Sequence, residues 1–220
     1  MPIGSRTKRP IVIALHGAAG DPRGMCLAGR WLFGTWPFVL CPQGERLGDR
    51  TFYWGDPKKM RAAIDRIVLL AEAKYPGRID PESIVWLSHS QAGILGAQTL
   101  AVPGIQIRRA VFFEGLPEDA ASLRTALERA GTERALFITQ HPGGLRRYEA
   151  AAAAVRPKVA ARAVFPGPYG PFTGRELRED PSRTSVAPRG RRELGSGGTA
   201  IVRVGCSLAC HNPRGGAMDD

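Results

Sequence analysis

One short segment of this 220-residue sequence combines a serine with surroundings that could make it reactive. Residues 83–87 read Ser-Ile-Val-Trp-Leu, which is typical of a buried strand, and residues 88–93 read Ser-His-Ser-Gln-Ala-Gly. A sharp turn here would hold the Ser90 hydroxyl clear of the backbone, and the following helix would offer free N–H groups to a developing negative charge. Small residues stand at 88 and 92, where the usual G-x-S-x-G pattern has glycines. We therefore predict that Ser90 is a nucleophile, with a helix-capping serine as the structural alternative.

A second segment that could take part in the chemistry reads His-Gly-Ala-Ala-Gly at residues 16–20, directly after the apolar run 11–15. If that run is a strand of the same sheet, this loop supplies a backbone N–H near Ala18 to an oxyanion, and the N–H of Gln91 supplies the other. His16 and His89 are expected to order their surroundings rather than to carry a proton.

A parallel sheet is needed to bring these segments together. The predicted strands lie near residues 10–16, 38–42, 83–88, 108–114, 134–140 and 159–165, and helical patterns cover 56–74, 91–101, 117–130 and 145–155. Strands spaced by helices of this length predict an α/β fold with a mostly parallel sheet and helices on both faces. Active sites of such folds lie at the carboxyl ends of the strands, where this sequence has its Gly, His and Ser residues.

The composition of the chain changes near residue 170. Residues 171–220 are rich in Gly, Pro, Ser and Arg and have no sustained apolar periodicity. We predict one α/β domain over residues 1–170 and a disordered or poorly packed tail over 171–220. A shifted reading frame or a fused segment would produce the same change in composition.

Charge and hydropathy narrow the choice of partners and location. The net charge is +11, but only five of the 31 basic residues are lysine, and the arginines are scattered with few aromatic residues among them. This pattern predicts a solvated basic surface and no nucleic-acid partner. No apolar run approaches the roughly 18 residues that cross a bilayer. No export signal is visible, so we expect a cytoplasmic protein without a membrane anchor, and the oligomeric state is left open.

The four cysteines are too few for a disulfide scaffold. Cys26 and Cys41 stand alone near apolar segments and are expected to be small core residues. Cys206, Cys210 and His211 lack the second ligand pair that a zinc site needs, so we predict no metal. We also predict no cofactor, because neither a P-loop nor a G-x-G-x-x-G after a strand is present.

Together these segments resemble a known family. The His-Gly loop, the Pro-Gln-Gly loop at 42–44, Trp-Gly at 54–55 and the Ser-His-Ser-Gln-Ala-Gly segment resemble the α/β-hydrolase superfamily, above all its small esterases and depolymerase-like members. The resemblance covers roughly residues 9–166. It implies a Ser–His–Asp/Glu triad that hydrolyses a small-molecule carboxylic ester through an acyl-enzyme on Ser90. It also implies substrate contacts at Gly17 and Trp54, with a buried core position as the alternative for Trp54.

The sequence departs from this family at the acid. The acid usually follows the strand that here ends at Thr139, and residues 140–144 contain no carboxylate. Glu114 ends the preceding strand and is the replacement that we expect. Asp119 is near but lies on the next helix.

It departs from the family at the base as well. The histidine usually follows the last strand, where this chain has Pro171. His211 and His141 are the candidates, and His211 is the one that remains if the chain is active. We expect no histidine to be well placed for Ser90. The alternative to a serine esterase is therefore a catalytically impaired protein of the same fold that binds a ligand or has no function.

Overall fold

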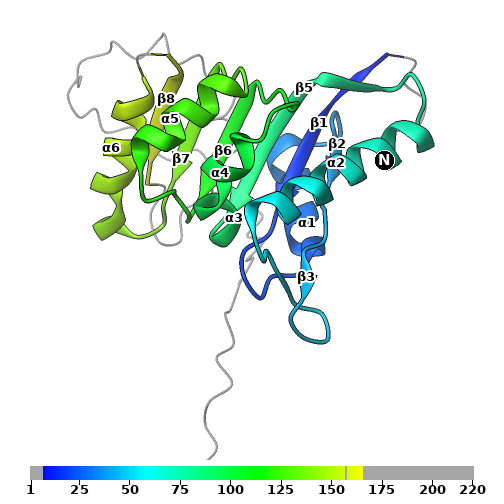
Figure 1. Cartoon of the computed structure of the whole chain (residues 1–220), viewed down its shortest axis with the longest axis horizontal. Coiled ribbons are helices and arrows are strands. Elements are labelled where there is room, and N and C mark those ends of the chain that lie inside the picture. The colour runs from blue at the N-terminus through cyan, green and yellow to red at the C-terminus, as the bar shows by residue number, and fades with distance from the viewer. Residues whose placement is uncertain (1–6, 157, 166–220) are drawn as a thin grey trace, which may run out of the picture. The chain divides into compact units, whose positions relative to one another are not determined.

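The computed structural model describes residues 7–156 and 158–165. Within them, six parallel strands form one sheet in the order β2-β1-β5-β6-β7-β8 (Figure 1). The strands are β1 (Arg9–Leu15), β2 (Phe38–Leu40), β5 (Ile79–His89), β6 (Arg109–Phe113), β7 (Arg134–Ile138) and β8 (Ala160–Val164). Each of the six predicted strand segments is in this sheet, so the predicted architecture is confirmed. The tail prediction falls on residues outside the described part of the chain.

Helices pack on both faces of the sheet. They are α1 (Pro22–Phe33), α2 (Pro57–Lys74), α3 (Gln91–Ile94), α4 (Gly96–Leu100), α5 (Ala120–Arg129) and α6 (Leu145–Val155), with a 3-10 turn at Pro142–Gly144. Side chains of β1 alternate between two cores, because successive residues of a strand point to opposite faces. Ile11 and Ile13 share a core with α2, α4, α5 and α6, whereas Val12 and Ala14 share one with α1. Figure 1 shows α2, α4 and α5 in front of the sheet.

Aspartates set the starts of three helices. Asp21, Asp56 and Asp119 are the N-cap residues of α1, α2 and α5, and each carboxylate accepts a backbone N–H from the first turn. α2 therefore begins where the sequence predicts. α5 begins three residues later than predicted, because the Asp119 carboxylate caps it by accepting from Ala121 and Ser122.

Helix α1 is an element that the apolar periodicity does not indicate. Its two glycines, Gly24 and Gly29, lower the intrinsic helix propensity. Gly29 has a packing role, because a Cβ added there would lie 2.8 Å from Val39 Cγ1. The Asp-Pro pair at 21–22 marks the helix start in the same way as the pair at 56–57, and could have indicated the helix. A short antiparallel pair, β3 (Glu45–Arg46) and β4 (Phe52–Tyr53), is also absent from the prediction.

A disulfide joins Cys26 in α1 to Cys41, the residue directly after β2. This finding corrects the expectation that both cysteines are unpaired core residues. α1 packs on β1 beside β2, and this packing brings the two Cα atoms to 5.7 Å, within the range that a disulfide requires. The pairing depends on α1, which the apolar periodicity does not indicate.

Removing this cross-link should destabilise the fold. The double variant Cys26→Ala, Cys41→Ala should lose about 3 kcal/mol of unfolding free energy, because the bond restricts the unfolded chain. Urea denaturation monitored by circular dichroism measures the loss. Dithiothreitol should destabilise the wild type and leave the double variant unchanged. An equal effect of dithiothreitol on both proteins would locate the sensitive thiols at Cys206 and Cys210 instead.

Candidate active site

Ser90 lies where β5 ends and α3 begins, at the carboxyl edge of the sheet. Its backbone has φ 50° and ψ −117°, a conformation that a residue with a side chain rarely adopts. The Ser90 N–H donates to the Phe113 carbonyl at 2.9 Å, and the Ser90 carbonyl accepts from the N–H groups of Gly93 and Ile94. Hydrogen bonds to β6 and to α3 therefore hold the sharp turn on both sides. We call residues 88–93 the serine turn.

Two glycines make room for the serine turn. A Cβ added at Gly115, just after β6, would overlap the Ser90 carbonyl, and one added at Gly93 would overlap the Gly115 carbonyl. The backbones of the turn and of the loop after β6 are thus in direct contact. Sequence reasoning identified Gly93 as a small neighbour of the serine but missed Gly115, whose partner is 25 residues away in the chain.

The hydroxyl of Ser90 is not used for capping. Ser90 is the N-cap residue of α3, yet its side chain makes no capping hydrogen bond. No other hydrogen bond to this hydroxyl is found within the described ranges of the chain. The structural alternative, a serine whose side chain caps a helix, therefore does not account for this residue.

The His-Gly loop, residues 16–20, lies against the Ser90 side chain. Leu15 pairs with Ser88 across β1 and β5, so Gly17 is level with Ser90. A Cβ added at Gly17 would lie 2.9 Å from Ser90 Cβ and 3.4 Å from its Oγ, so a side chain at position 17 would displace the loop. Ala18 is exposed at the top of this loop. Among the described residues, neither the Ala18 N–H nor the Gln91 N–H donates to another group.

His16 orders this loop from beneath, as expected. It is buried, Gly44 N–H donates to its Nε2 at 3.3 Å, and its Nδ1 lies 2.8 Å from the Gly17 carbonyl. Because Nε2 is an acceptor, Nδ1 carries the proton and donates to Gly17. Burial lowers the pKa of His16 below its usual 6.5, so the ring is neutral at pH 7.

His89 lies on the other side of Gly17. A Cβ added at Gly17 would be 3.0 Å from His89 Nδ1, and the imidazole packs against the Phe113 ring with centroids 5.3 Å apart. Burial lowers the pKa of His89, although the nearby Glu114 carboxylate opposes that shift. No hydrogen bond joins His89 to the Ser90 hydroxyl, which agrees with its expected packing role.

Glu114 follows β6 and reaches across to the end of β7. The strand register makes Ser90, Glu114 and Thr139 the first residues beyond three adjacent strands. Gln140 N–H donates to Glu114 Oε1, and the Thr139 hydroxyl donates to Oε2 at 3.5 Å. The Glu114 carboxylate therefore lies beside the residues that follow β7, the position where the family resemblance implies an acid.

The remaining candidates for acid and base lie elsewhere. Asp119 caps α5, and the Ser122 hydroxyl and the N–H groups of Ala121 and Ser122 lower the pKa of its carboxyl. His141 is exposed at the start of the 3-10 turn and makes no hydrogen bond to Ser90. His211 falls outside the described residues. Within the described ranges, no histidine hydrogen-bonds the Ser90 hydroxyl, and the expectation for the whole chain stays a prediction.

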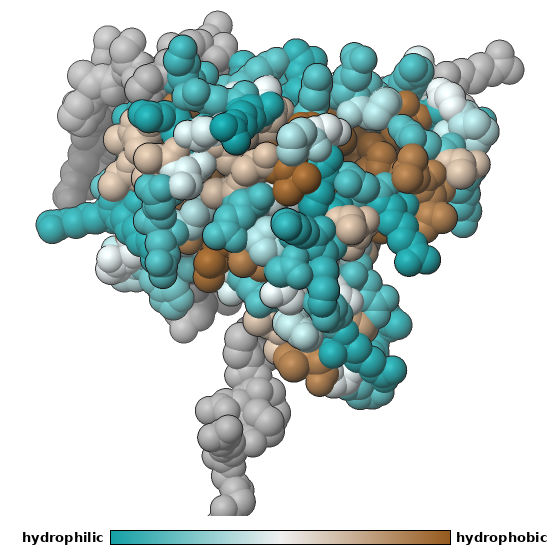
Figure 2. Space-filling model, in the orientation of Figure 1, coloured by the Kyte–Doolittle hydropathy of each residue, from teal (hydrophilic) through white to brown (hydrophobic). Residues whose placement is uncertain are grey.

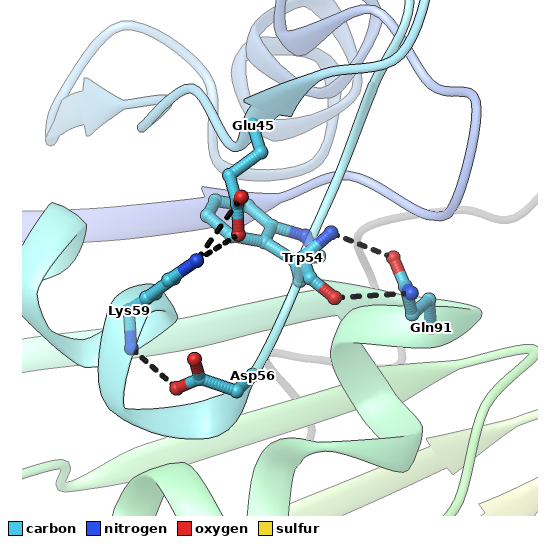
Figure 3. Close-up of polar contacts among 5 residues, drawn as sticks. All are labelled: Glu45, Trp54, Asp56, Lys59 and Gln91. Carbon is cyan, nitrogen blue, oxygen red and sulfur yellow. Dashed lines mark hydrogen bonds and ion pairs between the residues drawn. The ribbon is translucent and has the colours of Figure 1, made fainter.

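Trp54 occupies the core position, the alternative to lining a substrate pocket. It is 3% exposed, and its indole N–H donates to the His16 carbonyl at 2.7 Å. Its ring stacks on the His16 imidazole with centroids 4.6 Å apart. The Gln91 side chain bonds to the backbone of Trp54 (Figure 3). These contacts place Trp54 beneath the His-Gly loop.

An exposed apolar side chain lies close to Ser90. Ile94, in α3, is 50% exposed, and its N–H donates to the Ser90 carbonyl. Most of the face shown in Figure 2 is hydrophilic, with apolar surface gathered over α2, where Leu69 and Leu70 are exposed. Ile94 thus offers apolar surface next to the serine turn.

A cavity beside the His-Gly loop does not include Ser90 in its lining. Its volume is about 240 Å³, and it is lined by Asp21, Cys41, Arg50 and Phe52 among others. In residues 7–156 and 158–165, no three His, Cys, Asp or Glu side chains are grouped so that they could hold a metal ion. The features that could do chemistry are therefore the serine turn, the His-Gly loop and Glu114.

Comparisons with known proteins bear on the fold. No protein-family model and no curated protein matches the sequence. Solved structures do match. Esterase PE8 has a TM-score of 0.54 at 16% identity, over 74% of this chain and 85% of that one. A carboxylesterase from Mesorhizobium loti has a TM-score of 0.54 at 18% identity, and the match covers 80% of this chain and 88% of that one.

A third structure, an uncharacterized protein from Bacillus cereus, has a TM-score of 0.63 at 13% identity, over 81% of this chain and 60% of that one. At such identities a likeness in structure shows the fold alone. The sheet order, the strained residue between β5 and α3 and these matches agree with the resemblance found in the sequence. The chain has an α/β-hydrolase fold.

Proposed function

We propose that this protein is a serine hydrolase that cleaves a small-molecule carboxylic ester through an acyl-enzyme on Ser90. The observation that carries the proposal is the backbone of Ser90, held in a strained conformation at a strand-to-helix turn with its hydroxyl unused for capping. In this proposal the serine turn is a nucleophile elbow. The esterases among the structures of similar fold support an ester as the substrate.

The oxyanion of the tetrahedral intermediate would be stabilised by two backbone donors. We assign them to Ala18 and Gln91, whose N–H groups donate to no other group among the described residues. One donor comes from the His-Gly loop and the other from the start of α3. The site therefore needs both segments positioned so that the two N–H groups point at the same oxygen. Gly17 permits this, because only a residue without a side chain fits against Ser90.

Glu114 is the acid in this proposal. Its carboxylate would orient the base and stabilise the imidazolium that forms when Ser90 gives up its proton. The N–H of Gln140 and the hydroxyl of Thr139 keep this carboxylate at the end of β7. His211 is the base that an active enzyme requires, since His16 and His89 are committed to packing and to loop contacts.

A catalytically impaired protein of the same fold is the second candidate. It is favoured by one observation: in the described part of the chain, no imidazole hydrogen-bonds the Ser90 hydroxyl. Without a base the serine stays protonated and is a weak nucleophile. Such a protein would bind an ester or a related ligand and turn it over slowly or not at all.

Ile94 supports an apolar group on the substrate. Its half-exposed side chain lies beside the serine turn, where an acyl chain of a bound ester would cover it. Removing apolar surface of this kind from water is favourable. We therefore propose a substrate with an apolar acyl group.

Two observations concern location. No helix within the described ranges is long and apolar enough to cross a membrane. The Cys26–Cys41 disulfide is of a kind that persists in oxidising compartments and is rare in the cytoplasm. The disulfide therefore weighs against the cytoplasmic location that the sequence suggests.

Chemical labelling tests the nucleophile. A fluorophosphonate probe should modify Ser90, and Ser90→Ala should abolish both the labelling and any hydrolysis of p-nitrophenyl acetate, with a loss of at least about 10³-fold. Ser122→Ala, at an exposed position of α5, is the matched control and should react like the wild type. A folded wild type that resists the probe would favour the impaired protein.

Replacing the acid by its amide tests Glu114. Glu114→Gln keeps an oxygen that accepts from Gln140 N–H, so the fold should persist while kcat falls by about 10³- to 10⁴-fold and KM changes little. Steady-state kinetics with p-nitrophenyl acetate measure both constants. Glu118→Gln, four residues further on at an exposed position, should leave them unchanged. Equal constants for Glu114→Gln and the wild type would remove Glu114 from the proposed triad.

A further inference from the structure

The side chain of Gln91 binds both backbone polar groups of a residue far away in the sequence. Trp54 N–H donates to Gln91 Oε1 at 2.9 Å, and Gln91 Nε2 donates to the Trp54 carbonyl at 3.2 Å (Figure 3). A primary amide matches this pair because it presents one acceptor and one donor side by side. The contact fixes the loop before α2 directly against the start of α3.

Trp54 carries this contact onward to the His-Gly loop. Its indole N–H donates to the His16 carbonyl at 2.7 Å, and its ring lies against the His16 imidazole. His16 Nδ1 in turn lies 2.8 Å from the carbonyl of Gly17, the residue that lies against the Ser90 side chain. A continuous path of contacts thus runs from Gln91 through Trp54, His16 and Gly17 to Ser90. Ser90 is the residue directly before Gln91 in the sequence.

Other contacts of the loop before α2 are weaker anchors. Glu45 and Lys59 form an ion pair at 3.1 Å, but their side chains are 37% and 62% exposed, so solvent screens the attraction. Asp56 caps α2 by accepting from Lys59 N–H at 2.9 Å, and this bond fixes the helix start rather than the His-Gly loop (Figure 3). The Gln91 amide is the contact that joins the loop to the serine turn.

We propose that Gln91 is a positioning residue: its side-chain amide, through Trp54 and His16, sets the place of the His-Gly loop over Ser90. The inference rests on the proposed function, in which the two oxyanion donors are the N–H groups of Ala18 and Gln91. Gln91 then supplies one oxyanion donor with its own backbone N–H, and its side chain positions the other donor, the N–H of Ala18. A misplacement of about 1 Å in such a site costs about 10²-fold in rate.

The variant Gln91→Glu provides a pH-dependent test. An ionised carboxylate has two acceptors and repels the Trp54 carbonyl, whereas a protonated carboxyl again offers one acceptor and one donor. Partial burial and the facing carbonyl raise the pKa of the introduced carboxyl above its ordinary value of about 4.3. At about pH 8, Ser90 labelling should be 10- to 100-fold slower than in the wild type, and the ratio of the two rates should approach one as the pH falls.

Two further variants serve as controls. Gln91→Leu removes both hydrogen bonds, so Ser90 in this variant should be labelled more slowly than in the wild type by the same factor at every pH. In steady-state kinetics, its kcat should fall by a larger factor than its KM rises. Gln106→Glu makes the same charge change at an exposed position before β6 and should follow the wild type throughout. A ratio of the Gln91→Glu rate to the wild-type rate that does not change with pH would overturn the positioning role, and the same two folded proteins are compared at each pH.

Hydrogen exchange separates this inference from the proposed function. In Gln91→Leu the backbone amide of Trp54 loses its acceptor, so its exchange should be at least 10-fold faster, and that of residues 17–20 should also increase. Unchanged exchange in both segments would overturn the inference. A folded wild type that is not labelled at Ser90 would refute the proposed function alone, because the exchange measurement needs no activity.

Discussion

The candidate site depends on a close approach of backbones around Ser90 that only glycine allows. Gly17, Gly93 and Gly115 each meet the serine turn or its neighbour at a distance that leaves no room for a Cβ. Within the described residues, the non-glycine positions with positive φ are Ala19, Ser90 and Glu114, and they follow β1, β5 and β6 at one edge of the sheet. Strain of this kind persists only where the surrounding structure over-determines it. Here the central strands, buried on both faces, provide that rigidity.

The same packing determines what the nearby histidines can do. His16 and His89 flank Gly17, and burial lowers the pKa of both, so at neutral pH each is an uncharged ring. The two nitrogens of His16 are both used in loop contacts. The carboxylate of Glu114 lies on the far side of the serine turn, at the end of β7. In the proposed function, the described residues therefore supply the nucleophile Ser90 and the acid Glu114, and His211, outside those residues, is the base.

Much of the fold could be predicted because buried parallel strands leave a direct signal, a continuous apolar run that ends at a glycine or a polar residue. The same logic predicts the position of Glu114 at the end of β6, since topology places strand ends side by side, while its role as the acid stays a prediction. Helix α1 was missed because Gly29 serves packing at the expense of helix propensity, and the Cys26–Cys41 bond was missed with it. The contact of the Gln91 side chain with Trp54 depends on the path of a loop 37 residues away, which no local pattern reveals.

The two hydrogen bonds between Gln91 and Trp54 tolerate changes in the sequence of the loop before α2. Both hydrogen bonds go to the main chain of residue 54, so they do not depend on which side chains the preceding segment carries. The stretch from 46 to 52 includes residues that line the cavity beside the His-Gly loop, and it is exposed over much of its length. Substitutions there leave both hydrogen bonds to residue 54 in place, so the surface beside the cavity can change chemically without moving the His-Gly loop or the serine turn.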